Sequence, residues 1–452
     1  MAILFDPSNL FAGIAGDRDG ITADEFRKSV PRAREALKAF HKSVDQGKYG
    51  FPHLPFATAS HREILRYAAS VKGSYYCVCV VGIGGSALGA WALDCGLRGP
   101  HPVQPAFSTN NPRLVILDNV DPSFVMGALA SMNPKKTLVA VIAKSGATAE
   151  TVSAFLIVRD WLEKRLGLNK AKSRIVAVTS DGKGDLYKLA SGQGYRMFFL
   201  PDNVGGRFSV FSAVGLVPAA LCGLDIRKLC QGAASMTSLC WKNDLAVNPA
   251  LSAAIHHYLI WTKRNKPIQV AFAYSNRLWG AAFWFRQLWA ESLGKRFDRA
   301  GNEVHTGQTP IAALGSTDQH SQVQLYMEGP NDKTFTFWTV KKFDNPGRIP
   351  KAKTGLEAMD YLPGQTLAKL LNAEQRATAT ALAETGRPNS AFILDRVDAA
   401  HLGAFLQLLE FETAFAGELL GIDAFDQPGV ELGKKFTFAL MGRKGFDDYK
   451  RP

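Results

Sequence analysis

Four short runs of β-forming residues recur in the first half of the sequence, and a turn and a helix-forming stretch follow each of them. The runs cover residues 76–81, 114–117, 138–143 and 175–179. When a helix separates two strands in this way, it carries the chain back across the sheet, so the strands run parallel. The pattern therefore predicts a parallel sheet with helices on both faces.

A second series of β-forming runs begins at 268–273 and continues through 334–340 and 391–394. Two stretches with helical spacing of their apolar residues, 24–47 and 59–72, precede the first series. We therefore expect an α/β chain with two three-layer α/β/α sandwiches in tandem, mainly parallel sheets and flanking helices.

These patterns divide the chain into three expected units. They are an N-terminal helical segment at 1–70, a first sandwich at 71–204, and a second sandwich at 205–452 that includes C-terminal helices. Residues 202–209, between the sandwiches, contain Gly-Gly-Arg-Phe-Ser. We expect this stretch to mark a ligand crevice, since ligands of open parallel sheets bind at the carboxyl ends of the strands.

Composition limits the kind of ligand. Hydrophobic residues make up 46% of the chain and charged residues 21%, which is typical of a globular protein and excludes disorder. Lys and Arg total 53 against 40 Asp and Glu, a formal charge of +13, so the field of the protein favours anions such as phosphates, nucleotides or nucleic acid. The basic residues are dispersed and match no nucleic-acid-binding motif, so we expect no nucleic-acid partner.

The sequence favours a cytoplasmic protein. No two of the six cysteines have C-x-x-C spacing, and we expect them to be reduced and mostly buried. Residues 1–20 lack the basic and apolar regions of a secretory signal. Residues 73–93 carry no charge, but five glycines interrupt them, so they predict a strand, a turn and a helix rather than a membrane span.

A glycine-rich turn at 81–86, Val-Gly-Ile-Gly-Gly-Ser, closes the first predicted strand and leads into a helix. Glycines allow backbone N–H groups to approach a ligand, and a helix N-terminus adds partial positive charge. Gly84, Gly85 and Ser86 are thus candidate ligand-binding residues. A tight turn without a ligand is the alternative, and the lack of an acidic residue in the expected place argues against a dinucleotide.

A second candidate for phosphate binding follows the third predicted strand. Lys144, Ser145, Thr148 and Thr151 surround the first turn of a helix expected at 152–162. Hydroxyls, an ammonium group and free helix N–H groups together suit a phosphate. Simple N-capping by one hydroxyl is the alternative.

Two residues are candidates for acid–base chemistry and charge stabilisation. Arg207 follows two glycines, so its guanidinium can be aimed at an anion or a developing oxyanion; a surface turn is the alternative. Glu291 lies at the end of a mostly apolar stretch, where a carboxylate is costly to bury without a partner. It is a candidate base, and a salt bridge to Lys295 is the alternative.

Three histidines and a lysine complete the candidates. His320 lies in a polar turn before an alternating run at 322–327 that predicts a strand, and is either an acid–base residue or a surface histidine. His256 and His257 lie in an apolar helical stretch and are interpreted as structural. Lys434 follows a Gly-rich turn and either protonates a sugar hydroxyl or is solvated. No His, Cys and carboxylate cluster has metal-ligand spacing, so we expect no metal.

Together these segments resemble one family, the phosphoglucose isomerases, particularly the shorter bacterial form. The resemblance covers about residues 80–434. Its most specific parts are Asn-Val-Gly-Gly-Arg-Phe-Ser at 203–209 and Phe-Asp-Gln-Pro-Gly-Val-Glu-Leu-Gly-Lys at 425–434, which match the two signatures of that family. Glu-Ser-Leu-Gly-Lys at 291–295 and Asp-Gln-His-Ser at 318–321 lie between them.

The resemblance implies two sugar-isomerase (SIS) domains and interconversion of glucose 6-phosphate and fructose 6-phosphate in glycolysis and gluconeogenesis, without a cofactor. It implies that Glu291 moves a proton between C2 and C1 through a cis-enediol(ate) while Arg207 stabilises the negative charge. It also implies that His320 opens the sugar ring from the neighbouring subunit of a homodimer. Lys434 would act with it at the sugar oxygens.

The resemblance further implies which residues hold the substrate. Gln287 and Gln427 occupy the positions of sugar-contacting glutamines. Ser86, Ser145 and Thr148 occupy positions where the phosphate is held, with Gly84, Gly85 and Lys144 around them.

The sequence departs from the family in this phosphate loop. Ala143 stands where serine is usual and Ala147 where threonine is common, so phosphate affinity is expected to be weaker or to depend more on backbone N–H groups. Two other functions stay open: an isomerase of another phosphorylated aldose or ketose, and a non-catalytic sugar-phosphate sensor. A sensor would need the phosphate loop, but not Glu291, His320 and Lys434 together.

Overall fold

The computed structural model describes residues 3–100, 107–144, 146 and 148–449. Its strands are β1 (Ile3–Asp6), β2 (Cys77–Val81), β3 (Arg113–Leu117), β4 (Thr137–Ile142), β5 (Ile175–Thr179), β6 (Arg196–Phe199), β7 (Ile268–Ala273), β8 (Lys295–Phe297), β9 (Glu303–Thr306), β10 (Thr309–Leu314), β11 (Lys333–Val340) and β12 (Asn389–Leu394). Its α-helices are α1 (Ala12–Asp19), α2 (Ala23–Asp45), α3 (Thr58–Val71), α4 (Leu88–Arg98), α5 (Pro122–Ala130), α6 (Ala149–Leu166), α7 (Leu168–Lys172), α8 (Gly184–Gln193), α9 (Ala213–Leu221), α10 (Ile226–Cys240), α11 (Pro249–Arg264), α12 (Trp279–Leu293), α13 (Val323–Glu328), α14 (Leu367–Glu384), α15 (Ala399–Leu420) and α16 (Glu431–Leu440).

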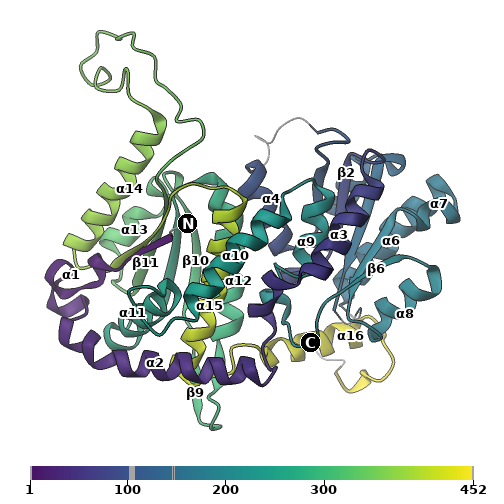
Figure 1. The fold of residues 1–452 in the computed structure, drawn as a ribbon, viewed down its shortest axis with the longest axis horizontal. Helices are drawn as coiled ribbons and strands as arrows, with labels where there is room; N and C mark the ends of the chain where they lie inside the picture. The colour runs from purple at the N-terminus through teal and green to yellow at the C-terminus, as the bar shows by residue number, and fades with distance from the viewer. Residues whose placement is uncertain (1–2, 101–106, 145, 147, 450–452) are drawn as a thin grey trace.

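Two five-stranded sheets organise the chain. The first has the order β3-β2-β4-β5-β6 and is parallel throughout. The second has the order β1-β12-β11-β7-β10 and is parallel except for β1, which pairs antiparallel with β12. Figure 1 shows the sheets toward the two ends of the molecule, with α10, α12 and α15 between them. The predicted α/β class with mainly parallel sheets is confirmed.

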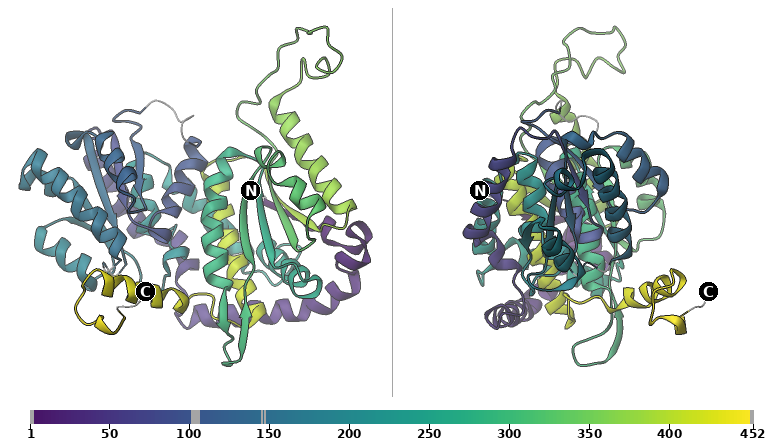
Figure 2. Two further views of the ribbon diagram at one scale, coloured as in Figure 1. Left: turned by 180° about the vertical axis from the view of Figure 1, so that it is seen from behind. Right: turned by 90° about the vertical axis from the view of Figure 1, so that its right-hand side faces the viewer.

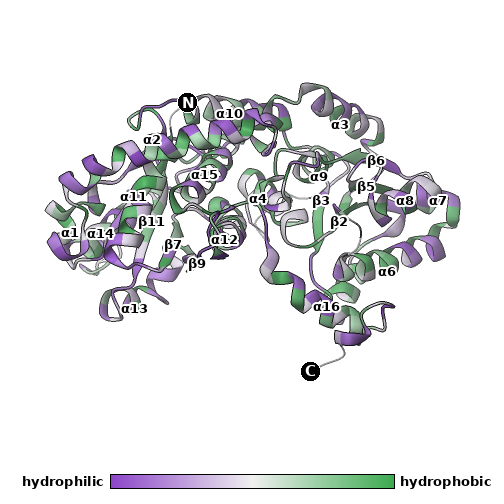
Figure 3. Ribbon diagram, turned by 90° about the horizontal axis from the view of Figure 1, so that it is seen from below, coloured by the Kyte–Doolittle hydropathy of each residue, from purple (hydrophilic) through white to green (hydrophobic). Residues whose placement is uncertain are grey.

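Central strands of both sheets are covered on two faces. Every residue of β2 and β4 is buried, as is expected for parallel strands with helices on both sides. In Figure 3, β2 and β3 are hydrophobic, whereas much of the outer helix α2 is hydrophilic. The helix α15 is buried over nearly its whole length, so it forms part of the core between the two sheets.

The helices α10 and α15 cross with their backbones in close contact. A Cβ atom on Gly232 of α10 would lie 1.8 Å from the carbonyl oxygen of Ala400, and one on Gly403 of α15 would lie 2.0 Å from that of Leu229. No side chain fits at either place. Two reciprocal glycines thus set the distance between these helices.

The structure corrects one prediction and adds an element. Residues 322–327 were expected to form a strand, but the helix α13 lies there, because Val323, Tyr326 and Met327 share one helical face that packs on the core of the second sheet. Strand β1 lies within 1–70, which was expected to be helical, and it completes the edge of the second sheet. We propose that the boundary between the first and the second sandwich lies near residue 204, because all five strands of the first sheet, β2 to β6, precede it.

Several other expectations are met within the described residues. All six cysteines are free and buried. The uncharged stretch 73–93 forms β2, a turn and the start of α4. His257 is structural: its Nδ1 lies 2.7 Å from Oε1 of Glu412 and its Nε2 lies 3.0 Å from Oγ of Ser390, all in the core.

None of the helices within the described residues has the length and apolar character required to cross a membrane.

The segment between β11 and α14, residues 341–366, extends away from the body of the molecule. Figures 1 and 2 show it as a long excursion beyond the end of α14. It carries exposed apolar side chains, among them Leu356, Met359 and Tyr361.

Replacing Gly232 by alanine tests the contact between α10 and α15. The added methyl group must push the two helix backbones apart, so Gly232→Ala should lower the free energy of unfolding by about 1–3 kcal/mol, as overpacking of a core typically does. Gly127→Ala is the matched control, because Gly127 lies inside α5 with no atom within 4 Å of an added Cβ. The control should be neutral or stabilising by about 0.5–1 kcal/mol. Equal denaturation midpoints for both variants would contradict the proposed contact.

Candidate active site

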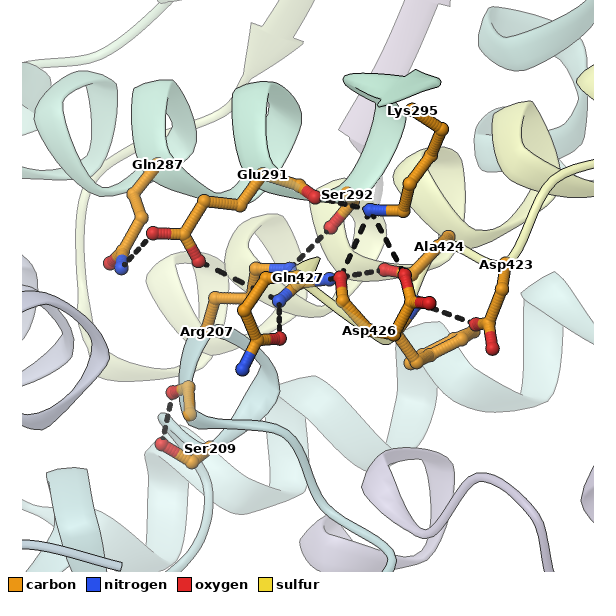
Figure 4. Close-up of polar contacts among 12 residues, drawn as sticks. Arg207, Ser209, Gln287, Glu291, Ser292, Lys295, Asp423, Ala424, Asp426 and Gln427 are labelled. Atoms are coloured by element: carbon orange, nitrogen blue, oxygen red, sulfur yellow. Dashed lines mark hydrogen bonds and ion pairs between the residues drawn. The ribbon is translucent and has the colours of Figure 1, made fainter. Parts of the chain in front are cut away.

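The helix α12 presents two polar side chains on one face. Gln287 and Glu291 are four residues apart, and Nε2 of Gln287 donates a hydrogen bond of 3.0 Å to Oε1 of Glu291 (Figure 4). The side chain of Glu291 is 34% exposed, although Trp284 and Trp289 on the same helix are buried in the core. Oε1 of Gln287 is buried and has no hydrogen-bond partner among the described residues. This face of α12 therefore offers a carboxylate and a free acceptor.

The guanidinium of Arg207 is the most buried charge beside this face, with 2% of its side chain exposed. It lies in a 3-10 turn, Gly206–Phe208. Its Nε donates to Oγ of Ser292 at 2.7 Å, and one terminal nitrogen donates to the carbonyl oxygens of Ala424 at 2.5 Å and Asp426 at 3.0 Å. Arg207 thus joins α12 to the segment that follows α15.

The other terminal nitrogen of Arg207 faces the candidate base. It donates to Oε1 of Gln427 at 2.9 Å and lies 3.6 Å from Oε2 of Glu291 (Figure 4). Burial lowers the pKa of Arg207, and the neighbouring charge of Glu291 opposes this shift. The site therefore holds a fixed cation next to a carboxylate, as needed for proton transfer that develops negative charge.

Lys295 is a second buried cation. Its Nζ donates to the carbonyl oxygen of Glu291 at 2.6 Å and to that of Asp426 at 2.9 Å, and lies 3.5 Å from the carboxylate of Asp426. Burial lowers its pKa, and the charge of Arg207 lowers it further. The ammonium binds the backbone of Glu291, so the salt bridge between these two side chains, our alternative interpretation of Glu291, is wrong. Sequence reasoning missed this anchoring role, although the Lys belongs to the Glu-Ser-Leu-Gly-Lys motif.

The glycine-rich turn after β2 lies directly against these residues. A Cβ on Gly84 would lie 2.7 Å from Nε2 of Gln287, and one on Gly85 would lie 2.4 Å from the carbonyl group of Gly206. Gly84 also has φ of +58°, which disfavours other residues. Ser86 ends this turn, half-buried. The carboxyl end of the first sheet therefore meets α12 and the turn of Arg207.

The second predicted phosphate turn adjoins the same region. Nζ of Lys144 donates to the carbonyl oxygens of Asp202 at 2.9 Å and Val204 at 3.0 Å, and burial lowers its pKa. Thr148 is the N-cap of α6, and its side chain makes no capping hydrogen bond to the first N–H groups of that helix. Ser145 and Ala147 lie outside the described residues. Ala143 is buried in the core of the first sheet.

His320 lies at the other end of the second sheet from Glu291. Glu291 is in the last turn of α12, close to the start of β10, because a Cβ on Gly307 would lie 2.8 Å from Cα of Gly294. From there the six residues of β10 extend for about 20 Å, and the exposed His320 follows their far end. One chain thus does not bring His320 to Glu291.

Lys434 also lies apart from the described contacts of Glu291. It is on α16, where its Nζ pairs with Oε1 of Glu431 at 2.7 Å, and both side chains are about half exposed. Figure 2 shows α16 projecting from the body of the molecule. Of the four implied catalytic residues, one chain brings Glu291 and Arg207 together. The two implied sugar-contacting residues, Gln287 and Gln427, lie beside them.

No group of three His, Cys, Asp or Glu side chains that could hold a metal ion occurs within the described ranges.

Comparison with solved structures shows the class of fold. A crystal structure of a hypothetical protein from Thermus thermophilus superposes with a TM-score of 0.86 at 35% identity, covering 98% of this chain and 100% of that one. A glucose-6-phosphate isomerase structure from Chlamydia trachomatis gives a TM-score of 0.82 at 21% identity, covering 96% and 89% of the two chains. The chain thus has the paired-sheet fold of phosphosugar isomerases.

Sequence comparison narrows this class to one family. The sequence profile named phosphoglucose isomerase matches residues 67–445. A glucose-6-phosphate isomerase from Carboxydothermus hydrogenoformans is 42% identical over 92% of this chain and 90% of its own length, and one from Thermus thermophilus is 40% identical over 86% and 89%. The chain belongs to the phosphoglucose isomerase family.

Replacing Lys295 by methionine tests how the C-terminal segment is held against α12. The change removes both hydrogen bonds to carbonyl oxygens, so Lys295→Met should lower the free energy of unfolding by about 1.5–3 kcal/mol, the usual range for a hydrogen bond from a charged group. The control is Lys28→Met, since the side chain of Lys28 is 77% exposed and its ion pair among the described residues is with Asp24 on the surface. It should leave the midpoint of urea denaturation nearly unchanged, because an exposed ion pair contributes little to stability. If both variants unfold at the same urea concentration, Lys295 does not anchor this segment.

Proposed function

We propose that this enzyme interconverts glucose 6-phosphate and fructose 6-phosphate in glycolysis and gluconeogenesis. The observation that carries the proposal is the position of the partly exposed Glu291 carboxylate, 3.6 Å from the buried guanidinium of Arg207, on a helix face that the glycine-rich turn at Gly84 approaches. Membership of the phosphoglucose isomerase family supports the same substrate pair.

In the proposed mechanism Glu291 is the base. It takes the proton from C2 of the open-chain aldose, and the electron pair moves to O1 to give a cis-enediolate. The charge of Arg207 stabilises this anion. The proton on O2 then passes to O1, the carbonyl forms at C2, and Glu291 returns its proton to C1. Gln287, whose Oε1 has no partner among the described residues, and Gln427 are proposed to bind sugar hydroxyls.

The phosphate of the substrate is proposed to lie between the two turns at the carboxyl end of the first sheet. Its proposed ligands are the backbone around Gly84 and Gly85, the hydroxyl of Ser86, Thr148 at the N-cap of α6, and Ser145. Lys144 supplies positive charge nearby. The first N–H groups of α6, which the Thr148 side chain does not cap, support this placement, because the N-terminus of a helix attracts a dianion. They also offset the loss of hydroxyls at Ala143 and Ala147.

The site is proposed to be completed by a second subunit. His320 lies a strand length away from Glu291 within one chain, which favours a homodimer in which the His320 of one chain opens the sugar ring bound to the other. Lys434 is proposed to act at the sugar oxygens, after its ammonium group leaves Glu431 on the same helix or after a partner subunit approaches α16. A cytoplasmic location is proposed from the six free, buried cysteines.

The two other functions are less well supported. A sugar-phosphate sensor would not need a carboxylate held beside a buried arginine. An isomerase of another phosphorylated sugar would use the same chemistry, so only the substrate distinguishes it. Direct assay with fructose 6-phosphate, coupled to detection of glucose 6-phosphate, separates these possibilities.

The variant Glu291→Gln tests the base. Glutamine keeps the size and a hydrogen-bond acceptor for Gln287 but has no basicity, so turnover should fall by at least about 100-fold while fructose 6-phosphate still binds. Calorimetry measures binding, and deuterium incorporation at C2 of glucose 6-phosphate in heavy water measures proton transfer. Deuterium exchange at the wild-type rate would show that another group is the base.

Mixing two inactive variants tests the shared site. His320→Ala and Glu291→Gln chains are each expected to be inactive, but a hybrid dimer contains one site with both residues intact. After subunit exchange, activity should therefore recover in part, up to about a quarter of the wild-type value when half the chains are of each kind and pairing is random. Mass spectrometry of the mixture confirms exchange. No recovery in a mixture that contains hybrid dimers would mean that His320 acts within its own chain or not at all.

A further inference from the structure

The second sheet has a pocket on the face that lies away from the proposed active site. The helix α14 covers β11 and β12 on this face but leaves the edge strand β1 open, and a cavity of about 390 Å³ lies between them. The opposite face of the same strands packs on the core that includes α12 and α15. The pocket is therefore separated from Glu291 by the whole sheet.

One largely buried side chain in the wall has an amide with no hydrogen-bond partner among the described residues. Gln375 of α14 is 8% exposed and lines the pocket, and its amide makes no hydrogen bond to the described residues. The neighbouring amides are occupied: Asn372 donates to the carbonyl oxygen of Val340 at 3.2 Å, and Asn389 donates to that of Ala379 at 2.9 Å. The amide atoms of Gln375 are not among the fully buried atoms that lack a partner in the described residues, so water reaches them and a ligand can replace that water.

Charged side chains of both signs line the pocket. Lys341 follows the carboxyl end of β11, and Arg376 lies on α14 without an ion pair among the described residues. Asp6 lies nearer the other end, opposite Ala391 in the register of β1 and β12. The weak contact of Lys341 with Asp395, 3.3 Å between two half-exposed groups, leaves the ammonium available. An anionic group can pair with these cations, and Asp6, whose Oδ1 already accepts from the N–H and the hydroxyl of Ser8, can accept from a hydroxyl donor through its other oxygen.

The size and the lining limit the ligand further. A cavity of this volume accepts a small metabolite. No aromatic side chain lines it, so it has no surface on which a nucleobase could stack. Ala379, Ala391 and Ile393 form an apolar part of the wall suited to a carbon chain.

We propose that this pocket binds a small phosphorylated polyol. Its phosphate lies between Arg376 and Lys341, and its hydroxyls bond to the amide of Gln375 and the carboxylate of Asp6. This site is independent of the isomerisation chemistry and would stand even if the proposed reaction were wrong.

A cysteine placed in the pocket wall gives a local test. All six native cysteines are buried, so Thr380→Cys, at an exposed position that lines the pocket, provides the accessible thiol. The control is Ala377→Cys, which is exposed on the same helix but does not line the pocket. The rate of thiol alkylation is measured with glycerol 3-phosphate as the probe, and separately with glycerol and with inorganic phosphate.

Glycerol 3-phosphate up to about 10 mM should slow alkylation of Thr380→Cys and leave Ala377→Cys unchanged, which corresponds to a millimolar or tighter dissociation constant. Adding Arg376→Met to Thr380→Cys should weaken this protection by at least about tenfold.

Protection by inorganic phosphate alone to the same extent would overturn the polyol part of the proposal. No protection, equal protection of both thiols, or protection that Arg376→Met leaves unchanged would overturn the site. Alkylation that slows with protein concentration and not with the probe would instead assign this face to contact between copies.

Discussion

The buried guanidinium of Arg207 holds together three parts of the chain that are distant in sequence. Its own turn precedes α9, Ser292 belongs to α12, and Ala424, Asp426 and Gln427 follow α15. A charge with 2% of its side chain exposed is stable only because each of these acceptors compensates its lost hydration. The geometry around Glu291 depends on this network, so the same contacts that allow the charge to be buried also fix the proposed catalytic cation.

The two sheets contribute opposite ends to this region. The first sheet supplies the carboxyl ends of β2 and β4, where ligands of parallel sheets usually bind. The second supplies the amino end, because α12 runs back along β7 before it reaches Glu291. Residues at the carboxyl end of the second sheet, such as His320, are therefore directed away from their own Glu291. This polarity is the structural reason to consider a site shared between two chains.

The sequence patterns predicted the strands and turns whose structure is determined by neighbouring residues. Hydrophobic runs with turns predicted the parallel strands, and glycines next to Ser86 and Arg207 marked turns that do meet in space. Strand β1 could not be predicted from its four residues, because its pairing partner β12 is remote in sequence. The six residues of α13 fit both a strand and a helix, and only the burial of Tyr326 decides between them. The anchoring by Lys295 depends on backbone carbonyls, which no side-chain pattern reveals.

The pairing of β1 with β12 also affects the order in which the chain can fold during translation. All strands of the first sheet lie between Cys77 and Phe199, so that sheet can form while the ribosome is still making the rest. The second sheet must wait for β12, and β1 stays unpaired until then, although it is made early. The acceptors of Arg207 at 424–427 emerge later still. A nascent chain would thus carry a finished first sheet, with the turns proposed to bind phosphate, well before the contacts of Arg207 could form.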